Sequence, residues 1–279
     1  MENLPYDLKD NIKNYLIFKP KTKKELQKAV DLWCEDKEEA LNYYCHISIW
    51  NTSLITDMSD LFKYKKNFND DISEWDVSSV IHMDSMFDGA FLFNHPLNSW
   101  DVSSVVCMNY MFSRAYKFNQ CLDSWNVSSV TDMGEMFHRA HSFNQPLDSW
   151  DVSSVSDMHA MFFGAFSFNQ HLNSWDVSSV TIMSSMFDGA SLFNQPMDSW
   201  DVSSVTSMQS MFYEAYSFNQ PLNLWNVSSV TDMNYMFYNA ALFNQPLNSW
   251  DISNVENTSN ILEKASSFDK NNATWYDFN

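Results

Sequence analysis

The sequence predicts an α/β repeat solenoid, a fold in which short strands and short helices alternate along a stack of similar units. Tryptophan recurs every 25 residues from Trp50 to Trp275, with no insertion or deletion between copies. Within a copy, apolar residues two apart indicate one face of a short parallel strand, and apolar residues spaced i, i+3, i+4, i+7 indicate a short helix. Because so small a unit cannot bury its own apolar side, the copies are expected to stack and share one core.

The copy that begins at Trp125 contains the expected elements in order, with positions counted from its tryptophan as zero. The strand covers residues 125–127, and the helix covers residues 133–140, with methionine at +8 and +11, phenylalanine at +12 and alanine at +15. Ser129, followed by an acid three residues later, provides a start like a capping box. Asn-Gln-Pro at 144–146 then ends the helix, and its asparagine column should satisfy backbone groups from one rung of the stack to the next.

We expect one cooperative domain in three parts. Residues 1–46 form a helical N-terminal cap, residues 47–255 form the solenoid, and residues 256–279 form a degenerate C-terminal cap. A cap is needed because the first rung would otherwise expose its apolar core to water. Within the N-terminal cap, one helix is expected around residues 7–16 and a second from residue 22 or 23 to about residue 42.

The chain is strongly acidic, with a formal net charge of −19 at pH 7. Without a basic stripe, this charge argues against nucleic acid or an anionic lipid surface as the partner. No apolar run approaches the roughly 18 residues that a membrane-spanning helix requires. The N-terminal residues carry Asp and Glu and lack the apolar stretch of a secretory signal peptide, so a cytoplasmic or intracellular location is expected.

Polar residues are expected to line the exposed side of the strand layer. If the residues at 0 and +2 point inward, position +1 points outward, and this position repeats aspartate. Stacked carboxylates suit a hard cation such as Ca²⁺, so weak divalent cation binding is one interpretation of this strip. The other is a hydrated ladder in which serine hydroxyls donate to the carboxylates. The strip consists of Asp76, Asp101, Asp151, Asp176, Asp201 and Asp251.

The variable residues fall on the expected helix side, at positions +9, +10, +13, +14 and +16. Exposed aromatic rings together with arginine are typical of residues that anchor protein–protein interfaces, so a protein partner is expected to bind here. The alternative is that these rings only cover the helices of their own rungs. The candidate residues are Tyr110, Arg114, Tyr116, Arg139, Phe163, Phe166, Tyr213, Tyr216, Tyr235 and Tyr238.

No pattern in the chain indicates catalysis, a cofactor or a metal centre. Serine and aspartate are abundant because they repeat, and none belongs to a distinctive catalytic constellation. His138 and His141 lack an obvious third ligand for a metal. With only four glycines, the chain has no phosphate-binding glycine-rich loop. A non-enzymatic protein is therefore expected.

The motif W-D-V-S-S-V-T-x-M-x-x-M-F-x-x-A-x-x-F-N-Q-P-L resembles the repeat of the BspA-like leucine-rich-repeat surface proteins, the mycoplasma-type lipoprotein repeat of unknown function. The resemblance covers about residues 47–268. It implies a right-handed, leucine-rich-repeat-like solenoid used for adhesion or protein binding. Unlike a surface lipoprotein, this sequence shows neither a signal peptide nor a lipobox cysteine.

These observations favour a protein-binding or scaffold solenoid whose partner the sequence does not identify. A surface adhesin of the BspA-like type is one alternative. Another is an adaptor for protein degradation, because Leu4, Pro5, Asp7 and Leu8 resemble the opening of an F-box.

Overall fold

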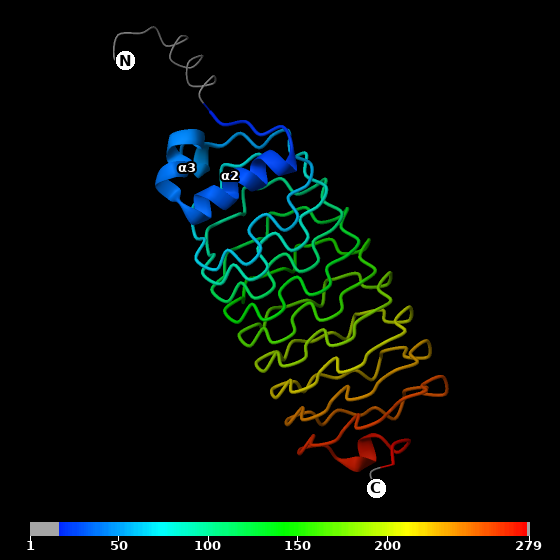
Figure 1. Ribbon diagram of the computed structural model, residues 1–279. Coiled ribbons are helices and arrows are strands. Elements are labelled where there is room, and N and C mark those ends of the chain that lie inside the picture. Colours follow the sequence, from blue (N-terminus) through cyan, green and yellow to red (C-terminus); the bar gives the residue numbers. More distant parts are fainter. Residues whose placement is uncertain (1–16, 278–279) are drawn as a thin grey trace, which may run out of the picture.

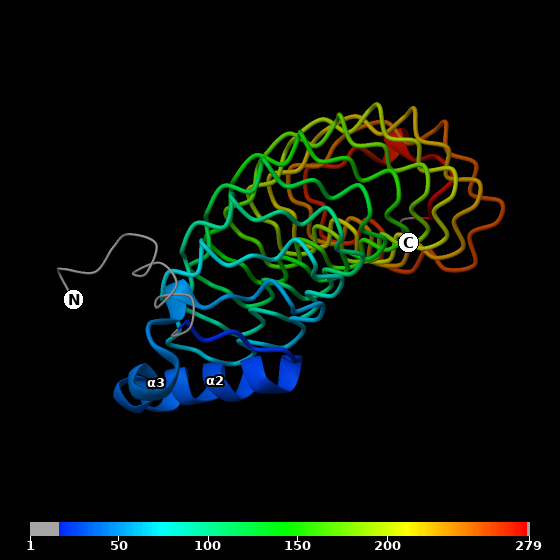
Figure 2. The same ribbon diagram turned by 90° about the horizontal axis from the view of Figure 1, so that it is seen from above.

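The computed structural model describes residues 17–277 and shows a stack of rungs wound along one axis (Figure 1). Among these residues, two α-helices come first, α2 (Lys23–Glu35) and α3 (Lys37–Tyr44), and two short 3-10 helices, η1 (Ile47–Ile49) and η2 (Lys270–Asn272), lie near the two ends of the stack. Figure 2 shows the same stack from above, with the rungs following one another from the N-terminal helices to the C-terminal end. Among residues 17–277, no helix is both long and apolar enough to cross a bilayer.

The predicted α/β solenoid is wrong in both of its repeating elements. Across the described residues, the rungs contain neither strands nor α-helices and consist of turns joined by extended residues. Neighbouring rungs share single parallel bridges at position +7, from Asp57–His82 at one end to Asp232–Asn257 at the other. Pairing between rungs therefore occurs five residues beyond the predicted strand, which ends at +2.

A run of overlapping turns replaces the predicted helix. In the rung that begins at Trp100, Tyr110 and Arg114 both have a φ of 56°, which lies in the left-handed region and interrupts a right-handed helix. Positive φ recurs at +10 and +14 in most rungs. Because these turns repeat every four residues, they place nearly the same side chains inward as a helix with 3.6 residues per turn. The apolar spacing is therefore compatible with both structures.

Backbone N–H groups in the turn run alternate between two kinds of partner. The N–H of Met111 donates to the oxygen of Met108 in the same rung, at 3.2 Å. The N–H of the preceding residue, Tyr110, donates instead to Gly134 in the following rung, at 2.9 Å. A helix would use these N–H groups internally and leave none to join the rungs. The turn run thus provides local structure and inter-rung contacts at once.

The apolar positions of the repeat form one continuous core, as the sequence predicts. In the rung of Trp125, the side chains of Met133, Met136, Phe137 and Ala140 have no exposed surface. Phenylalanine rings at +12 stack on their equivalents in the next rung, with centroids 5.4–5.7 Å apart. Each such pair contributes about 0.5–1.5 kcal/mol beyond the burial of its area.

From Trp75 onward, each tryptophan donates its indole N–H to the turn that leads into the preceding tryptophan. Trp150 Nε1 donates to the backbone oxygen of Leu122 at 3.0 Å, and the backbone N–H of Trp125 donates to that same oxygen at 3.1 Å. Both lone pairs of a buried carbonyl are therefore used. The indole bond recurs in every rung from Trp75 to Trp275.

The asparagine column predicted at the return turn is confirmed. Asn119 Oδ1 accepts the backbone N–H of Asn144 at 2.9 Å and the side-chain amide of Gln145 at 3.0 Å. The same two bonds recur along the stack. Side-chain amides thus satisfy backbone groups at this turn, where no strand ladder exists to do so.

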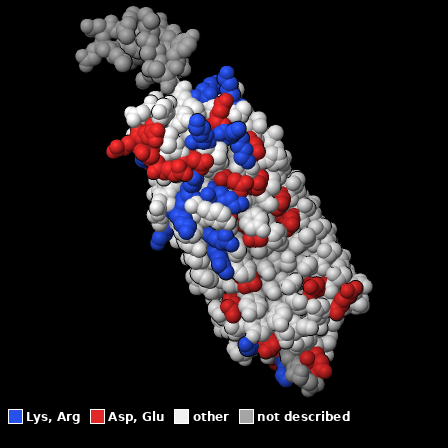
Figure 3. Space-filling model, in the orientation of Figure 1, with Lys and Arg blue, Asp and Glu red and all other residues white. Residues whose placement is uncertain are grey.

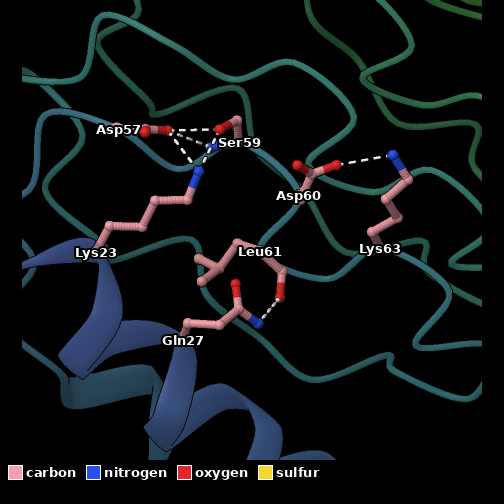
Figure 4. Close-up of polar contacts among 7 residues, drawn as sticks. All are labelled: Lys23, Gln27, Asp57, Ser59, Asp60, Leu61 and Lys63. Atoms are coloured by element: carbon pink, nitrogen blue, oxygen red, sulfur yellow. Dashed lines mark hydrogen bonds and ion pairs between the residues drawn. The ribbon is translucent and has the colours of Figure 1, made fainter.

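Helix α2 packs against the first rung. The ring of Trp33 is buried and its centroid lies 5.9 Å from that of Trp50. Along the polar edge of the helix, Lys23 Nζ lies 3.0 Å from Asp57 Oδ1, and Gln27 Nε2 donates to a backbone oxygen of the first rung at 3.0 Å (Figure 4). The helix therefore contacts this rung through both an apolar and a polar side.

The helix predicted from residue 22 or 23 to about residue 42 is divided in two. Asp36 lies between α2 and α3, and its carboxylate accepts the N–H of Glu39 at 2.9 Å, which caps the start of α3. The helix expected around residues 7–16 and the F-box-like residues 4–8 lie outside the described residues. The division of the chain at residues 46 and 255 stays a prediction.

A turn run and a helix respond differently to glycine. Ser210 has a φ of 53°, whereas its neighbour Gln209 does not have a positive φ. We expect Ser210→Gly to raise the free energy of unfolding by about 0.5–1 kcal/mol, because glycine adopts positive φ without strain. Gln209→Gly should lower it by about the same amount. Urea unfolding of both variants measures this, and destabilisation by both glycines would favour a helix instead.

Candidate partner-binding surface

The ten candidate binding residues lie on the turn run rather than on helices. The side chains outside the core at positions +9 to +17 of the rungs are termed the turn face. Arg139, Phe166 and Tyr216 are exposed, and the other seven candidates are half-buried. Positions +13, +14 and +16 alternate with the buried positions +12 and +15, so the turn face rests directly on the core.

Aromatic rings at position +16 form a continuous stack over four rungs, termed the ring column. Ring centroids are 4.7 Å apart between Phe91 and Tyr116, 4.6 Å between Tyr116 and His141, and 4.7 Å between His141 and Phe166. The sequence-based candidates omit Phe91, although it occupies the same repeat position as Tyr116. The rings cover one another, as the alternative interpretation expects, but Phe166 remains 48% exposed.

Position +13 holds a second set of ring contacts. Tyr213 and Tyr238 stack with their centroids 4.8 Å apart, and Tyr235 meets Tyr238 edge-on at 5.6 Å. Nearer the N-terminus, Phe163 meets His138 edge-on at 4.7 Å. The structure therefore brings Tyr213, Tyr235 and Tyr238 into one cluster, whereas Tyr116 and Phe166 belong to the ring column.

Basic residues gather on the N-terminal half of the molecule in the view of Figure 3. On the turn face, Lys66 Nζ lies 5.4 Å from the ring centroid of Phe91, and Arg114 Nη1 lies 3.8 Å from Asp88 Oδ1. Arg139 lies 5.8 Å from the centroid of a phenylalanine ring in the next rung. Cation–π contacts at exposed sites contribute about 0.5–1 kcal/mol each, so Lys66 and Arg139 support the rings beside them.

Further along the turn face, Asp188 and Glu214 place negative charge in adjacent rungs. Burial, together with the charge of Glu214, raises the pKa of Asp188 to about 7. Burial and the same neighbouring carboxylate also raise the pKa values of Tyr213 and Tyr216. None of the ion pairs among residues 17–277 includes Asp188. Its carboxylate is thus half-buried without a cation of the chain to offset the cost.

The histidine pair considered in the sequence does not act together. His141 belongs to the ring column, whereas His138 Nδ1 lies 2.7 Å from Glu135 Oε2. Burial lowers the pKa of His138, and a hydrogen bond to Asp157 raises the pKa of His159. In the described part of the chain, no three His, Cys, Asp or Glu side chains lie together as metal ligands would.

The aspartates at +1 are exposed but do not line a sheet. Asp151 Oδ1 accepts the N–H of Ser153 at 3.1 Å and its hydroxyl at 2.6 Å, and these bonds lower the pKa of Asp151. Each bond closes a turn within one rung, so divalent cation binding by the strip stays a prediction. The bond to the serine N–H is also present at Asp76, Asp101, Asp176, Asp201 and Asp251.

Comparison with known families identifies the repeat. The family described as "Mycoplasma protein of unknown function, DUF285" matches the chain over residues 36–145, 108–195 and 168–275. This match supports the repeat family predicted from the motif, but it does not establish the BspA-like identity or a leucine-rich repeat. No curated protein matches the chain.

Replacing Asp188 should change how stability depends on pH. Its pKa of about 7 lies above the ordinary value of 3.8, so the folded protein retains a proton that the unfolded chain releases, and stability falls as the pH rises between these values. We expect Asp188→Asn to raise the free energy of unfolding by about 1–2 kcal/mol at pH 8, a figure reduced for partial exposure, and to change it little at pH 4. Urea unfolding at both pH values tests this.

The control for that measurement is Asp251→Asn, which removes an exposed carboxylate whose pKa is lowered by hydrogen bonds to Ser253. It should give no gain at pH 8. An equal gain from Asp188→Asn at both pH values would contradict the titration of this carboxylate.

Proposed function

We infer that the chain, which belongs to the DUF285 family of mycoplasma proteins of unknown function, is a non-enzymatic binding or scaffold protein that recognises a partner protein through its turn face. The exposure of the rings of Phe166 and Tyr216 is the observation that carries this inference. Large aromatic side chains contribute a disproportionate share of binding energy when a partner covers them, and arginines beside them are enriched in the same interfaces.

The turn face also differs from rung to rung, whereas the remainder of the rung is nearly constant. Position +1 carries only Asp or Asn in the rungs from Asn51 to Asp251. Such a uniform column gives a partner no unique register along the stack. Position +16 specifies one, because it carries in order Lys66, Phe91, Tyr116, His141, Phe166, Ser191, Tyr216 and Ala241.

A surface adhesin is the second candidate, supported by the resemblance of the repeat to that of BspA-like surface proteins. The intracellular scaffold and the adhesin differ in where the turn face is presented. Protease treatment of intact cells separates them. We expect the chain to be protected, and its digestion while a cytoplasmic marker stays intact would favour the adhesin.

The double variant Phe166→Ser/Tyr216→Ser should weaken partner binding by about tenfold or more, because each ring anchors the interface. Both side chains are exposed, so the unfolding midpoint should stay close to that of the wild type. Affinity purification with quantitative mass spectrometry measures the recovery of each partner.

The matched control is Leu224→Ser, which removes an apolar side chain that is 72% exposed and lies outside the turn face. Partners should be recovered normally with this variant. Undiminished recovery with the double variant would count against the turn face as the binding surface.

A further inference from the structure

Two rungs of the stack share one local sequence but differ in what surrounds it. Ser-Met-Phe-Asp-Gly-Ala occurs at residues 85–90 and again at residues 185–190. In both copies the glycine N–H donates to position +13 of the following rung, from Gly89 at 2.8 Å and from Gly189 at 2.7 Å. The aspartate before each glycine therefore occupies an equivalent backbone position, although Asp88 is buried and Asp188 is half-buried.

The first copy has a cation beside its aspartate and the second does not. Arg114, at +14 of the following rung, lies 3.8 Å from Asp88. The residue at that position next to Asp188 is Glu214, whose charge is opposite to that of arginine. The chain thus supplies its own guanidinium to one copy of the motif and a second carboxylate to the other.

The second copy also lacks the ring that the first possesses. Position +16 holds Phe91 in the first copy and Ser191 in the second, so the ring column ends at Phe166. Tyr216 resumes the column one rung further on. Phe166 and Tyr216 are 48% and 41% exposed, whereas Tyr116 and His141 inside the column are half-buried. The two rings that border Ser191 therefore retain uncovered surface.

The rung between Phe166 and Tyr216 carries Ser191 at +16, so no ring of the chain stands between them at this position. Two rung steps separate Phe166 from Tyr216, which corresponds to about 9–10 Å. A planar group halfway between them would lie about 5 Å from each ring, within the range of stacking and cation–π contacts. Gly189 lies beside this place and has no side chain to fill it. A Cβ at residue 189 would lie 4.0 Å from Cε1 of Phe166.

We propose that an arginine side chain of a partner protein occupies this place. Its guanidinium lies between the rings of Phe166 and Tyr216 and donates hydrogen bonds to the carboxylates of Asp188 and Glu214. Arginine suits the site better than lysine, because its planar guanidinium stacks on rings and bonds two carboxylate oxygens at once. A basic partner also complements the net charge of −19. This inference rests on the proposed function and names the chemistry of the partner.

The test uses the full chain and three fluorescein-labelled hexapeptides, Gly-Ser-X-X-Ser-Gly, in which X is arginine, lysine or citrulline. Titration by fluorescence anisotropy should show the arginine peptide binding about tenfold tighter than the lysine peptide, and the citrulline peptide weaker still. Equal affinities for the arginine and lysine peptides would overturn the proposal, since they would indicate attraction by net charge alone.

The decisive variant is Glu214→Arg, which gives Asp188 the neighbour that Asp88 already has. It should weaken binding of the arginine peptide by about tenfold or more, because the chain's own guanidinium then pairs with the carboxylate. Glu256→Arg makes the same change of charge at an exposed residue away from the turn face and should leave the affinity nearly unchanged. Equal losses in the two variants would overturn the proposal.

Other occupants give distinct outcomes. If the occupant is a second copy of the chain, sedimentation experiments should show a dimer, and Glu214→Arg should abolish that dimer. This result would identify a second copy, rather than another protein, as the partner. Loss of cellular partners in the Phe166→Ser/Tyr216→Ser variant, together with no preference for the arginine peptide, would leave the proposed function standing and reject the arginine.

Discussion

The stack depends on one backbone carbonyl in each rung that accepts two hydrogen bonds. Leu122 illustrates it: its oxygen accepts the backbone N–H of Trp125 and the indole N–H of Trp150. The first bond closes a turn, and the second fixes the distance to the next rung. A residue inserted between these tryptophans would move the indole away from its acceptor and leave a buried N–H unpaired, which costs about 1–3 kcal/mol. This requirement gives a physical reason for a period of 25 residues without exception.

The same division between local and inter-rung bonds explains why the rungs contain neither helices nor strands. A helix uses its N–H groups within itself, and a strand uses them with neighbouring strands. In the turn run, Met111 bonds within its rung and Tyr110 bonds to the next. The apolar spacing identified the buried residues correctly, because a turn every four residues buries the same set as a helix. It could not reveal the positive φ of Tyr110 or Glu135, since neither side chain favours that conformation.

Positions on the turn face were predictable for a related reason. A constant period places every side chain beside its equivalents 25 residues away, so the contacts of Tyr116 with Phe91 and His141 follow from their shared position. What the sequence-based interpretation missed at Asp188 was a relation between different positions. The cation beside Asp88 is Arg114, at +14 of the following rung. A comparison restricted to the +13 residues of successive rungs does not include it.

Under the proposed function, recognition depends on adjacent rungs rather than on single ones. Residues 85–90 and 185–190 are identical in sequence, yet one aspartate has Arg114 beside it and the other has Glu214. The rigid frame keeps these neighbours in fixed register, so a single substitution in the next rung changes the charge that a partner meets without changing the fold beneath it. Because the core and the indole bonds involve other positions, the turn face can vary from rung to rung at little cost to stability.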